Sequence, residues 1–250
     1  MCRPSVQILL QTASIVVVAK PSGVAVHRGW AEDRYPLLQR VRDTLGGTWV
    51  YPVHRLDRAT SGAVIFARSS EAAARLSEGF RGAAHEKRYV ALTRGLVDDE
   101  GTIDHPVPRN KSKQSERVPA RTHFARLATQ GRFSWALVRP ETGRLHQIRR
   151  HFKHLSHPLV GDVRYGKGEN NRAFRSDCGL HRLALHALAI AFEDPETAQV
   201  HRVHAPLPDD LRKPLLRFDL PEAALDFDPW DPVNEKRLRG DPKEREFPAP

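Results

Sequence analysis

The first third of the chain contains short β-branched runs and a segment with apolar residues at helical spacing. Valine and isoleucine dominate residues 6–10 and 14–21, and the polar residues between them predict a hairpin. Leucine and valine recur at helical spacing in residues 36–45, which predicts a helix. Two further strands, at 48–56 and 62–68, are predicted to flank a loop made of the turn formers in DRATSG, residues 57–62.

The middle and end of the chain continue this pattern. A helix is predicted at 69–80, with Ser69 or Ser70 as N-cap and Glu71 near its positive end. A short basic helix is predicted at 144–155 and a late helix, interrupted by Pro214, at 208–218. The remaining strands are predicted at 86–95, 101–107, 122–129, 134–140, 185–192 and 199–205.

Two segments lack such periodicity. Residues 107–121 are polar and basic, so we expect a mobile arm there. After Phe227 the chain is dense in proline and charge, which predicts a loosely held tail at 226–250. Because strands outnumber helices without regular alternation, the sequence predicts an α+β protein with an antiparallel-rich sheet.

Composition narrows the class of protein. The 250 residues are 40% hydrophobic and 28% charged, a globular balance, and the net charge of +10 favours a polyanionic partner such as nucleic acid. An irrelevant basic surface is the alternative. Two distant cysteines provide neither a disulfide framework nor a thiolate metal site. Without a bilayer-length apolar run or a continuous signal-peptide core, we expect a cytoplasmic protein.

The loop at residues 52–62, PVHRLDRATSG, carries the first candidate group. Asp57 lies between Arg55 and Arg58, close to His54. The carboxylate is either an ordinary ion-pair partner of these arginines or a nucleophile kept ionised beside a negatively charged substrate.

A second cluster, PETGRLHQIRRHFKHLSHP, spans residues 140–158. Its cations suit a helix that faces phosphates, although a solvated helix face has the same composition. Its histidines could bind zinc, but carboxylates are scarce and the neighbouring cations would repel a divalent ion. Tyr89, predicted in mid-strand, either packs in the sheet or places its ring against a base.

Taken together, HRLDRATSG, KRYVALTRG and TGRLHQIRRH resemble the pseudouridine synthases that act on ribosomal and transfer RNA. The early segment AKPSGVAVHR also matches, and the likeness runs from about Val6 to Ala205. The segments VHRGW and HPLVGDVRYGKGENNR, with GLHRLALHA, are similar to the branch that modifies uridine 65 of tRNA.

This resemblance implies a fold and a set of site residues. The fold would be a mixed, mostly antiparallel sheet in two merged halves, with flanking helices and a central cleft. Residues 1–225 would form a single catalytic domain without a separate N-terminal RNA-binding module. Asp57 would be the catalytic aspartate, Arg149 its ion-pair partner and Tyr89 the residue that stacks on the target base. Arg55 would enter the space left by the extruded uridine, and the other expected RNA contacts are Lys20, His54, Arg144, His146, Gln147 and Arg150.

The implied reaction is the isomerisation of uridine to pseudouridine in structured RNA. It needs no metal, cofactor or cosubstrate, and we expect none, nor an obligate protein partner or a membrane. Transfer RNA is the expected partner and ribosomal RNA the alternative. Two rivals remain at this point: a non-catalytic RNA-binding protein, and a nuclease that uses some of the thirteen histidines.

Overall fold

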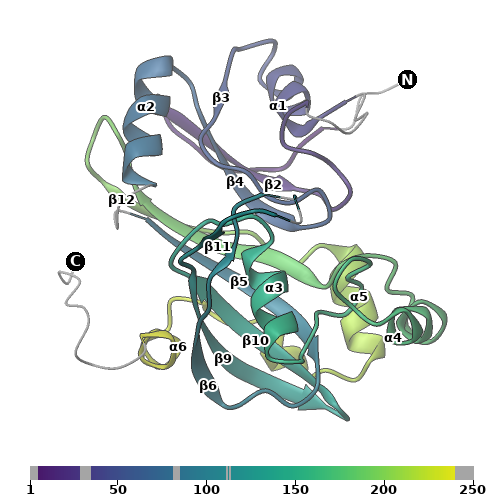
Figure 1. Ribbon diagram of the computed structural model, residues 1–250. Helices are drawn as coiled ribbons and strands as arrows, with labels where there is room; N and C mark the ends of the chain where they lie inside the picture. Colours follow the sequence, from purple (N-terminus) through teal and green to yellow (C-terminus); the bar gives the residue numbers. More distant parts are fainter. Residues whose placement is uncertain (1–4, 29–34, 81–84, 111, 113, 240–250) are drawn as a thin grey trace. The chain divides into compact units, whose positions relative to one another are not determined.

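The computed structural model describes residues 5–28, 35–80, 85–110, 112 and 114–239. The chain forms two compact units, one of Met1–Lys87 with Leu185–Leu211 and one of Arg88–Ala184 with Arg212–Pro250 (Figure 1). Within the described ranges, no helix is long and apolar enough to cross a membrane.

The described part of the first unit contains six strands. These are β1 (Ile8–Gln11), β2 (Ile15–Lys20), β3 (Tyr51–Pro52), β4 (Ser61–Ala67), β11 (Leu185–Glu193) and β12 (Val200–His204). Strands β1, β2, β4 and β11 are neighbours in this order, β12 also pairs with β11, and β3 also pairs with β4. All these pairs are antiparallel except β4 with β11, which lie parallel with Ser61 opposite His186.

Two helices accompany these strands. Helix α1 (Leu37–Thr44) buries Leu37 and Val41, as its apolar spacing predicts. Helix α2 (Ser70–Gly79) begins at Ser69, whose side chain accepts a 3.0 Å hydrogen bond from the Ala72 N–H. The buried side of α2 joins the apolar residues of β2, β4 and β11 in one core cluster.

The second unit is built on antiparallel strands in the order β5-β10-β9-β6. Their bounds are β5 (His85–Arg94), whose first three residues belong to the first unit, β6 (Glu100–Asp104), β9 (Arg121–Gln130) and β10 (Phe133–Pro140). Helix α3 (Gln147–His154) packs on β10, and α6 (Pro232–Leu238) packs on β9 and β6 (Figure 1). The other helices are α4 (Gly168–Ala173), a π-helical turn (Phe174–Cys178), α5 (Asp209–Arg217), which begins in the first unit, and a 3-10 turn (Glu222–Ala224).

The predicted fold class is confirmed: the protein is α+β, with a mixed, mostly antiparallel sheet and flanking helices. The first hairpin, the strands β4, β5, β9, β10, β11 and β12, and the helices α1, α2 and α3 lie where the sequence predicts them. Helix α5 continues through Pro214 instead of breaking there. Helix α4 was not predicted, and the central cleft stays a prediction.

The expected mobile arm has an ordered base. Strand β7 (Val107–Pro108) pairs with β8 (Arg117–Val118), and the valines are buried together with Ala120. Two small strands and three apolar residues are too few to produce a visible periodicity, which explains why the sequence predicts no structure here. Lys111 and Lys113, within the same segment, lie outside the described residues.

The expected C-terminal tail is also partly structured. Residues 228–239 contain α6, and the buried guanidinium of Arg139 donates two hydrogen bonds to the Leu238 carbonyl oxygen, at 3.2 and 2.8 Å. The guanidinium of Arg88 lies over the Trp230 ring, 4.0 Å from its centroid. This part of the predicted tail is therefore packed into the second unit. The rest, residues 240–250, lies outside the described residues.

Candidate active site

Asp57 lies in the loop that joins β3 to β4. In this loop Leu56 is buried, Asp57 is half-buried, and Arg55 and Arg58 are exposed. The Thr60 N–H donates to the Asp57 carbonyl oxygen at 3.0 Å, which closes a turn directly after the aspartate. The half-buried carboxylate is thus carried by a turn and not by a strand or helix.

A buried ammonium group holds this loop. Lys20, at the end of β2, is 1% exposed, and its Nζ donates to the carbonyl oxygens of Pro21, Val24 and Arg58 at 3.0, 2.6 and 3.1 Å. Because the first two acceptors belong to the segment after β2 and the third to the Asp57 loop, Lys20 joins the two. Its ammonium thus bonds within the chain, and the RNA contact predicted for Lys20 stays a prediction.

Three more hydrogen bonds join the same two segments. The Ser22 hydroxyl donates to the Ala59 carbonyl oxygen, and the Gly23 N–H donates to that of Arg58, both at 2.8 Å. The Arg58 guanidinium returns a bond from Nε to the Gly23 carbonyl oxygen at 2.8 Å. Hydrogen bonds to residues 20–24 therefore fix the main chain around Asp57.

His54 supports the loop from its other end. Its Nε2 accepts a 3.1 Å hydrogen bond from the Ile65 N–H of β4, and its ring stacks on Phe80. Burial, and then the positive charge of Lys87, lower the pKa of His54 from its ordinary value to about 3. The imidazole is therefore neutral at physiological pH and does not supply the positive charge expected of a phosphate contact.

Both interpretations of Asp57 stay predictions. The Arg58 guanidinium donates a hydrogen bond to the Gly23 carbonyl oxygen. Arg55 is exposed. The exposed position of Arg55 leaves its guanidinium accessible to RNA.

In the second unit, Arg149 forms a two-point ion pair with Asp162. Its Nε and Nη2 donate to the two carboxylate oxygens at 2.7 and 2.9 Å, and both side chains are buried. The N–H groups of Arg164 and Tyr165 donate to the same carboxylate at 2.9 and 3.0 Å. The guanidinium also lies 5.1 Å from the Tyr165 ring centroid. The arginine is thus held in one orientation.

The electrostatics of Asp162 follow from these contacts. Burial by itself would raise the pKa of this carboxyl group. The hydrogen bond from Arg149, the backbone N–H of Tyr165, the arginine charge and the N–H of Arg164 outweigh burial and lower the pKa below its ordinary value. Asp162 is therefore ionised at neutral pH.

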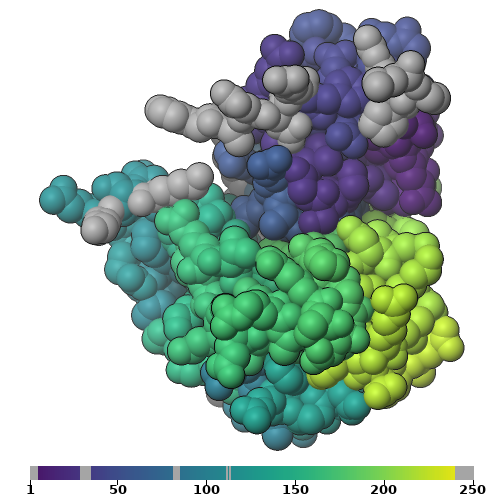
Figure 2. Space-filling model, turned by 90° about the vertical axis from the view of Figure 1, so that its right-hand side faces the viewer, coloured from purple at the N-terminus to yellow at the C-terminus, as the bar shows by residue number. Residues whose placement is uncertain are grey.

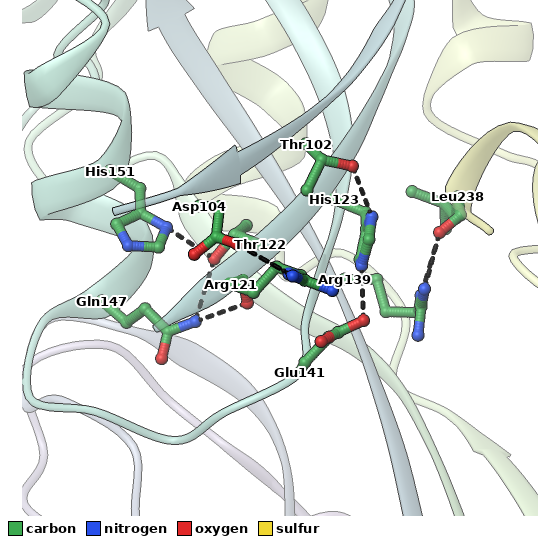
Figure 3. A network of polar contacts seen from close by, with 10 residues as sticks. All are labelled: Thr102, Asp104, Arg121, Thr122, His123, Arg139, Glu141, Gln147, His151 and Leu238. Carbon is green, nitrogen blue, oxygen red and sulfur yellow. Dashed lines mark hydrogen bonds and ion pairs between the residues drawn. The ribbon is translucent and has the colours of Figure 1, made fainter. Parts of the chain in front are cut away.

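Other polar groups of α3 bond to the strand beneath it (Figure 3). The Gln147 amide donates to the Arg121 carbonyl oxygen and the Thr122 hydroxyl, both at 2.9 Å, and its oxygen accepts from Thr142. His151 bonds to Thr122 through Nδ1 and to the His105 carbonyl oxygen through Nε2, each at 2.9 Å. Gln147 and His151 therefore fix α3 to β9 and to the segment before β7. The RNA contact predicted for Gln147 stays a prediction.

Arg150 and His146 share a partner, the Tyr165 hydroxyl, at 3.1 and 2.9 Å. Arg150 also donates to the Pro108 carbonyl oxygen at 2.6 Å, which ties α3 to the β7–β8 hairpin. Arg144 and Lys153, in contrast, are exposed. Figure 2 shows the segment from α3 to α4, in green, at the surface of the second unit. The phosphate contacts predicted for this segment stay predictions.

Tyr89 lies in β5, opposite Val138 of β10, so its mid-strand position is as predicted. Asp57 belongs to the first unit, whereas Tyr89 and Arg149 belong to the second. The ion pair of Asp57 with Arg149 and the stacking role of Tyr89 stay predictions.

Sequence reasoning missed Asp162 and its support. The Asn171 side chain accepts from the Gly161 N–H at 2.9 Å and donates to the Asp162 carbonyl oxygen at 3.0 Å. The only available signal in the sequence was GDVRYG, residues 161–166. Its glycine and aspartate are turn formers and follow the apolar pair Leu159 and Val160. Among the described residues, no three His, Cys, Asp or Glu side chains are grouped so that they could hold a metal ion.

Comparisons with known proteins agree with these motifs. The family model for RNA pseudouridylate synthase matches residues 14–154, more than half of the chain. The tRNA pseudouridine synthase C of Pasteurella multocida is 40% identical over 217 residues, which cover 78% of this chain and 88% of that protein. The tRNA pseudouridine synthase C of Vibrio parahaemolyticus is 35% identical over 240 residues, covering 88% and 97%.

A solved structure supports the same assignment. Human RNA Pseudouridylate Synthase Domain Containing 1 superposes with a TM-score of 0.68 at 27% identity, covering 84% of this chain and 89% of that one. The matched residues include the Asp57 loop, Tyr89 and Arg149. The chain therefore belongs to the RNA pseudouridylate synthase family and is an enzyme that isomerises uridine in RNA.

Proposed function

We propose that the chain makes pseudouridine in transfer RNA, at the position of uridine 65, with Asp57 as the essential carboxylate. The observation that carries the catalytic part is the loop of Asp57, whose main chain is fixed by hydrogen bonds from Lys20, Ser22 and Gly23. The substrate part rests on relatives named tRNA pseudouridine synthase C, which are 35–40% identical to this chain. A cytoplasmic location remains part of the proposal.

The reaction is balanced without a co-reactant. The C–N bond between uracil and the ribose C1′ breaks, uracil turns over, a bond forms between its C5 and C1′, and the C5 proton moves to nitrogen. An ionised Asp57 serves this reaction in one of two ways, by attack on C1′ or by removal of a C2′ proton. Both routes need the carboxylate in its anionic form, and nearby RNA phosphates would repel this negative charge.

Arg149 is the residue that we propose to offset this repulsion. A planar guanidinium that is already oriented by Asp162 can face a second carboxylate without losing further conformational freedom. In this proposal Asp162 acts through Arg149 and does not contact the RNA. Tyr89 would place its ring against the uracil, with the hydroxyl near C5.

The target uridine has to leave its stack before the reaction, and we propose that it is flipped out. The exposed Arg55 would fill the space that the base leaves, since a guanidinium plane stacks well between bases. Arg144, Lys153 and His146 would contact phosphates. For Lys20, His54, Gln147 and Arg150 we propose support of the site in place of direct RNA contact, because their polar groups bond within the chain.

The test is incubation of the wild-type protein and Asp57→Asn with unmodified tRNA and with ribosomal RNA, followed by pseudouridine mapping. We expect pseudouridine at uridine 65 of tRNA with the wild type only. Modification of ribosomal RNA alone would reject tRNA as the substrate. Full activity of Asp57→Asn would reject the role of the aspartate, and RNA binding without any modification would indicate a non-catalytic protein.

A further inference from the structure

The Asp57 loop ends at a buried serine that bonds to a buried histidine. Ser61 is the first residue of β4, and His186 is the second residue of β11, its parallel neighbour (Figure 1). The two side chains are 1% and 2% exposed, and Ser61 Oγ lies 2.7 Å from His186 Nδ1. On its other side, His186 Nε2 lies 2.9 Å from the carbonyl oxygen of Ala205, directly after β12.

The carbonyl oxygen fixes the direction of one hydrogen bond, and a neutral imidazole then fixes the direction of the other. A carbonyl oxygen only accepts, so His186 carries a proton on Nε2 and donates to Ala205. A neutral imidazole then has a lone pair on Nδ1, which accepts from the Ser61 hydroxyl. The histidine thus connects the start of β4 to the end of β12 through a single tautomer.

The backbones of β4 and β11 lie too close together beside this hydrogen bond to accommodate a side chain at Gly62. Gly62 has a φ of +118°, and a Cβ atom there would lie 2.1 Å from the Ala187 carbonyl oxygen. Any side chain at position 62 would push β4 away from β11. Ser61 and Gly62 therefore pack closely against His186 and Ala187 at the point where the Asp57 loop enters β4.

We propose that His186 is a positioning residue for uridine isomerisation: through Ser61 it sets the point at which the Asp57 loop enters β4. Asp57 precedes Ser61 by four residues, and the turn closed by the Thr60 N–H transmits a shift of Ser61 to the aspartate. This inference rests on the proposed catalytic role of Asp57. A displacement of about 1 Å at a reacting group lowers turnover by up to about a hundredfold.

A matched control separates positioning from simple stabilisation. Ser14 is also a buried serine of the first unit, 2% exposed, and its hydroxyl bonds to the Asp194 carboxylate at 3.0 and 3.1 Å. It precedes β2 at the other end of β4, where Ile15 pairs with Ala67. Ala67 lies six positions after Ser61 along β4, a distance of about 20 Å. Ser14→Ala therefore removes a comparable bond far from Asp57.

The experiment compares Ser61→Ala with Ser14→Ala in the full chain, measuring turnover at saturating tRNA transcript, KM and the unfolding midpoint. We expect both variants to be destabilised, and only Ser61→Ala to lose kcat, by about tenfold at a KM within twofold of wild type. Equal kcat values for the two serine variants would overturn the inference.

A second pair tests the histidine directly and carries the comparison if Ser61→Ala does not fold. His186→Asn keeps an acceptor near the place of Nδ1, whereas His186→Gln keeps a donor that reaches toward Ala205. We expect His186→Asn to retain kcat within about threefold and His186→Gln to fall about tenfold. The reverse order, or equal loss, would overturn the inference. Asp57→Asn in the same assay tests the proposed function separately, since its activity would reject that function whatever the serine variants show.

Discussion

The Asp57 loop and the α3 region use their charged residues in opposite ways. In the loop, side chains from other segments hold the main chain, chiefly Lys20 through the Arg58 carbonyl oxygen, while Arg55 stays exposed. In the α3 region, the charged side chains of the helix themselves make the contacts, as in the pair of Arg149 with Asp162 and the bond of Arg150 to Pro108.

This difference shows that a dense run of cations does not by itself identify exposed positive charge. Residues 144–155 carry more positive charge than the Asp57 loop, yet Arg149 and Arg150 stabilise their own unit. The phosphate contacts that we propose here are those of the exposed Arg144 and Lys153, together with His146. Substitutions in the two regions should therefore change different measured quantities.

The largest effect is expected at the carboxylate of the loop. Asp57→Asn keeps the shape of the side chain and removes its charge, so single-turnover isomerisation should fall on the order of 10⁴-fold. Affinity for tRNA, measured by filter binding, should stay within a few-fold because the phosphate contacts remain. Turnover near the wild-type value would show that the loop does not carry the reacting group.

Lys20→Met tests the support of the loop. The change removes the ammonium group that donates to three carbonyl oxygens. We expect kcat to fall by about a hundredfold and the free energy of unfolding to fall by roughly 3 kcal/mol. Lys153→Met is the control, since this lysine is exposed on α3. If both variants kept wild-type kcat, the buried ammonium would not position the Asp57 loop.

Asp162→Asn tests the α3 region. It leaves the buried guanidinium of Arg149 without its anion, so urea unfolding should show a loss of about 3 kcal/mol at pH 7. Asp104→Asn breaks the exposed ion pair with Arg121 and should cost less than about 1 kcal/mol. Comparable losses for the two variants would contradict the dominant role of the buried pair.

The same variant predicts a pH dependence. The pKa of Asp162 is lowered in the folded state, so its contribution to stability is complete above the ordinary carboxyl pKa, about 3.9. This contribution is lost as the pH falls through the lower, folded-state pKa. The stability gap between wild type and Asp162→Asn should therefore narrow in acid, and a constant gap between pH 7 and pH 3 would refute the assignment.

The smallest effects are expected at the exposed cations. Arg144→Gln and Lys153→Gln should each weaken tRNA binding a few-fold and reduce the slope of log affinity against log salt by about 0.7 to 0.9. Arg150→Gln should leave that slope nearly unchanged and lower the unfolding midpoint, because its guanidinium bonds to Pro108 and Tyr165. Equal slopes for all three variants would contradict the distinction between cations that contact phosphates and cations that bond within the chain.

Local patterns were sufficient for most of the elements. Ser69 marks the start of α2, and the runs of β-branched residues mark β2 and β4, because capping and burial act on neighbouring residues. The motif around Asp57 also predicts a loop. These features depend on interactions within a few residues, so they can be read from the sequence.

Contacts between distant residues could not be predicted in this way. The bond of Arg139 to Leu238 spans 99 residues, and it gives structure to a segment whose composition resembles a tail. Asp162 lies 13 residues from Arg149, and nothing in its local sequence identifies this partner. The same holds for Ser61 and His186, 125 residues apart. Burial by distant partners decides which polar residues support the site.

The order of the two units along the chain has a consequence for synthesis on the ribosome. The first unit is discontinuous, since Leu185–Leu211 completes it after most of the second unit has been made. Ser61 therefore leaves the ribosome 144 residues before Ala205, the carbonyl partner of His186. Translation proceeds at about 5 to 20 residues per second, so roughly 7 to 30 s pass between the synthesis of Ser61 and that of Ala205. A chain truncated before residue 185 would thus contain Asp57, Tyr89 and Arg149. It would lack His186 and Ala205, on which the proposed positioning of the Asp57 loop depends.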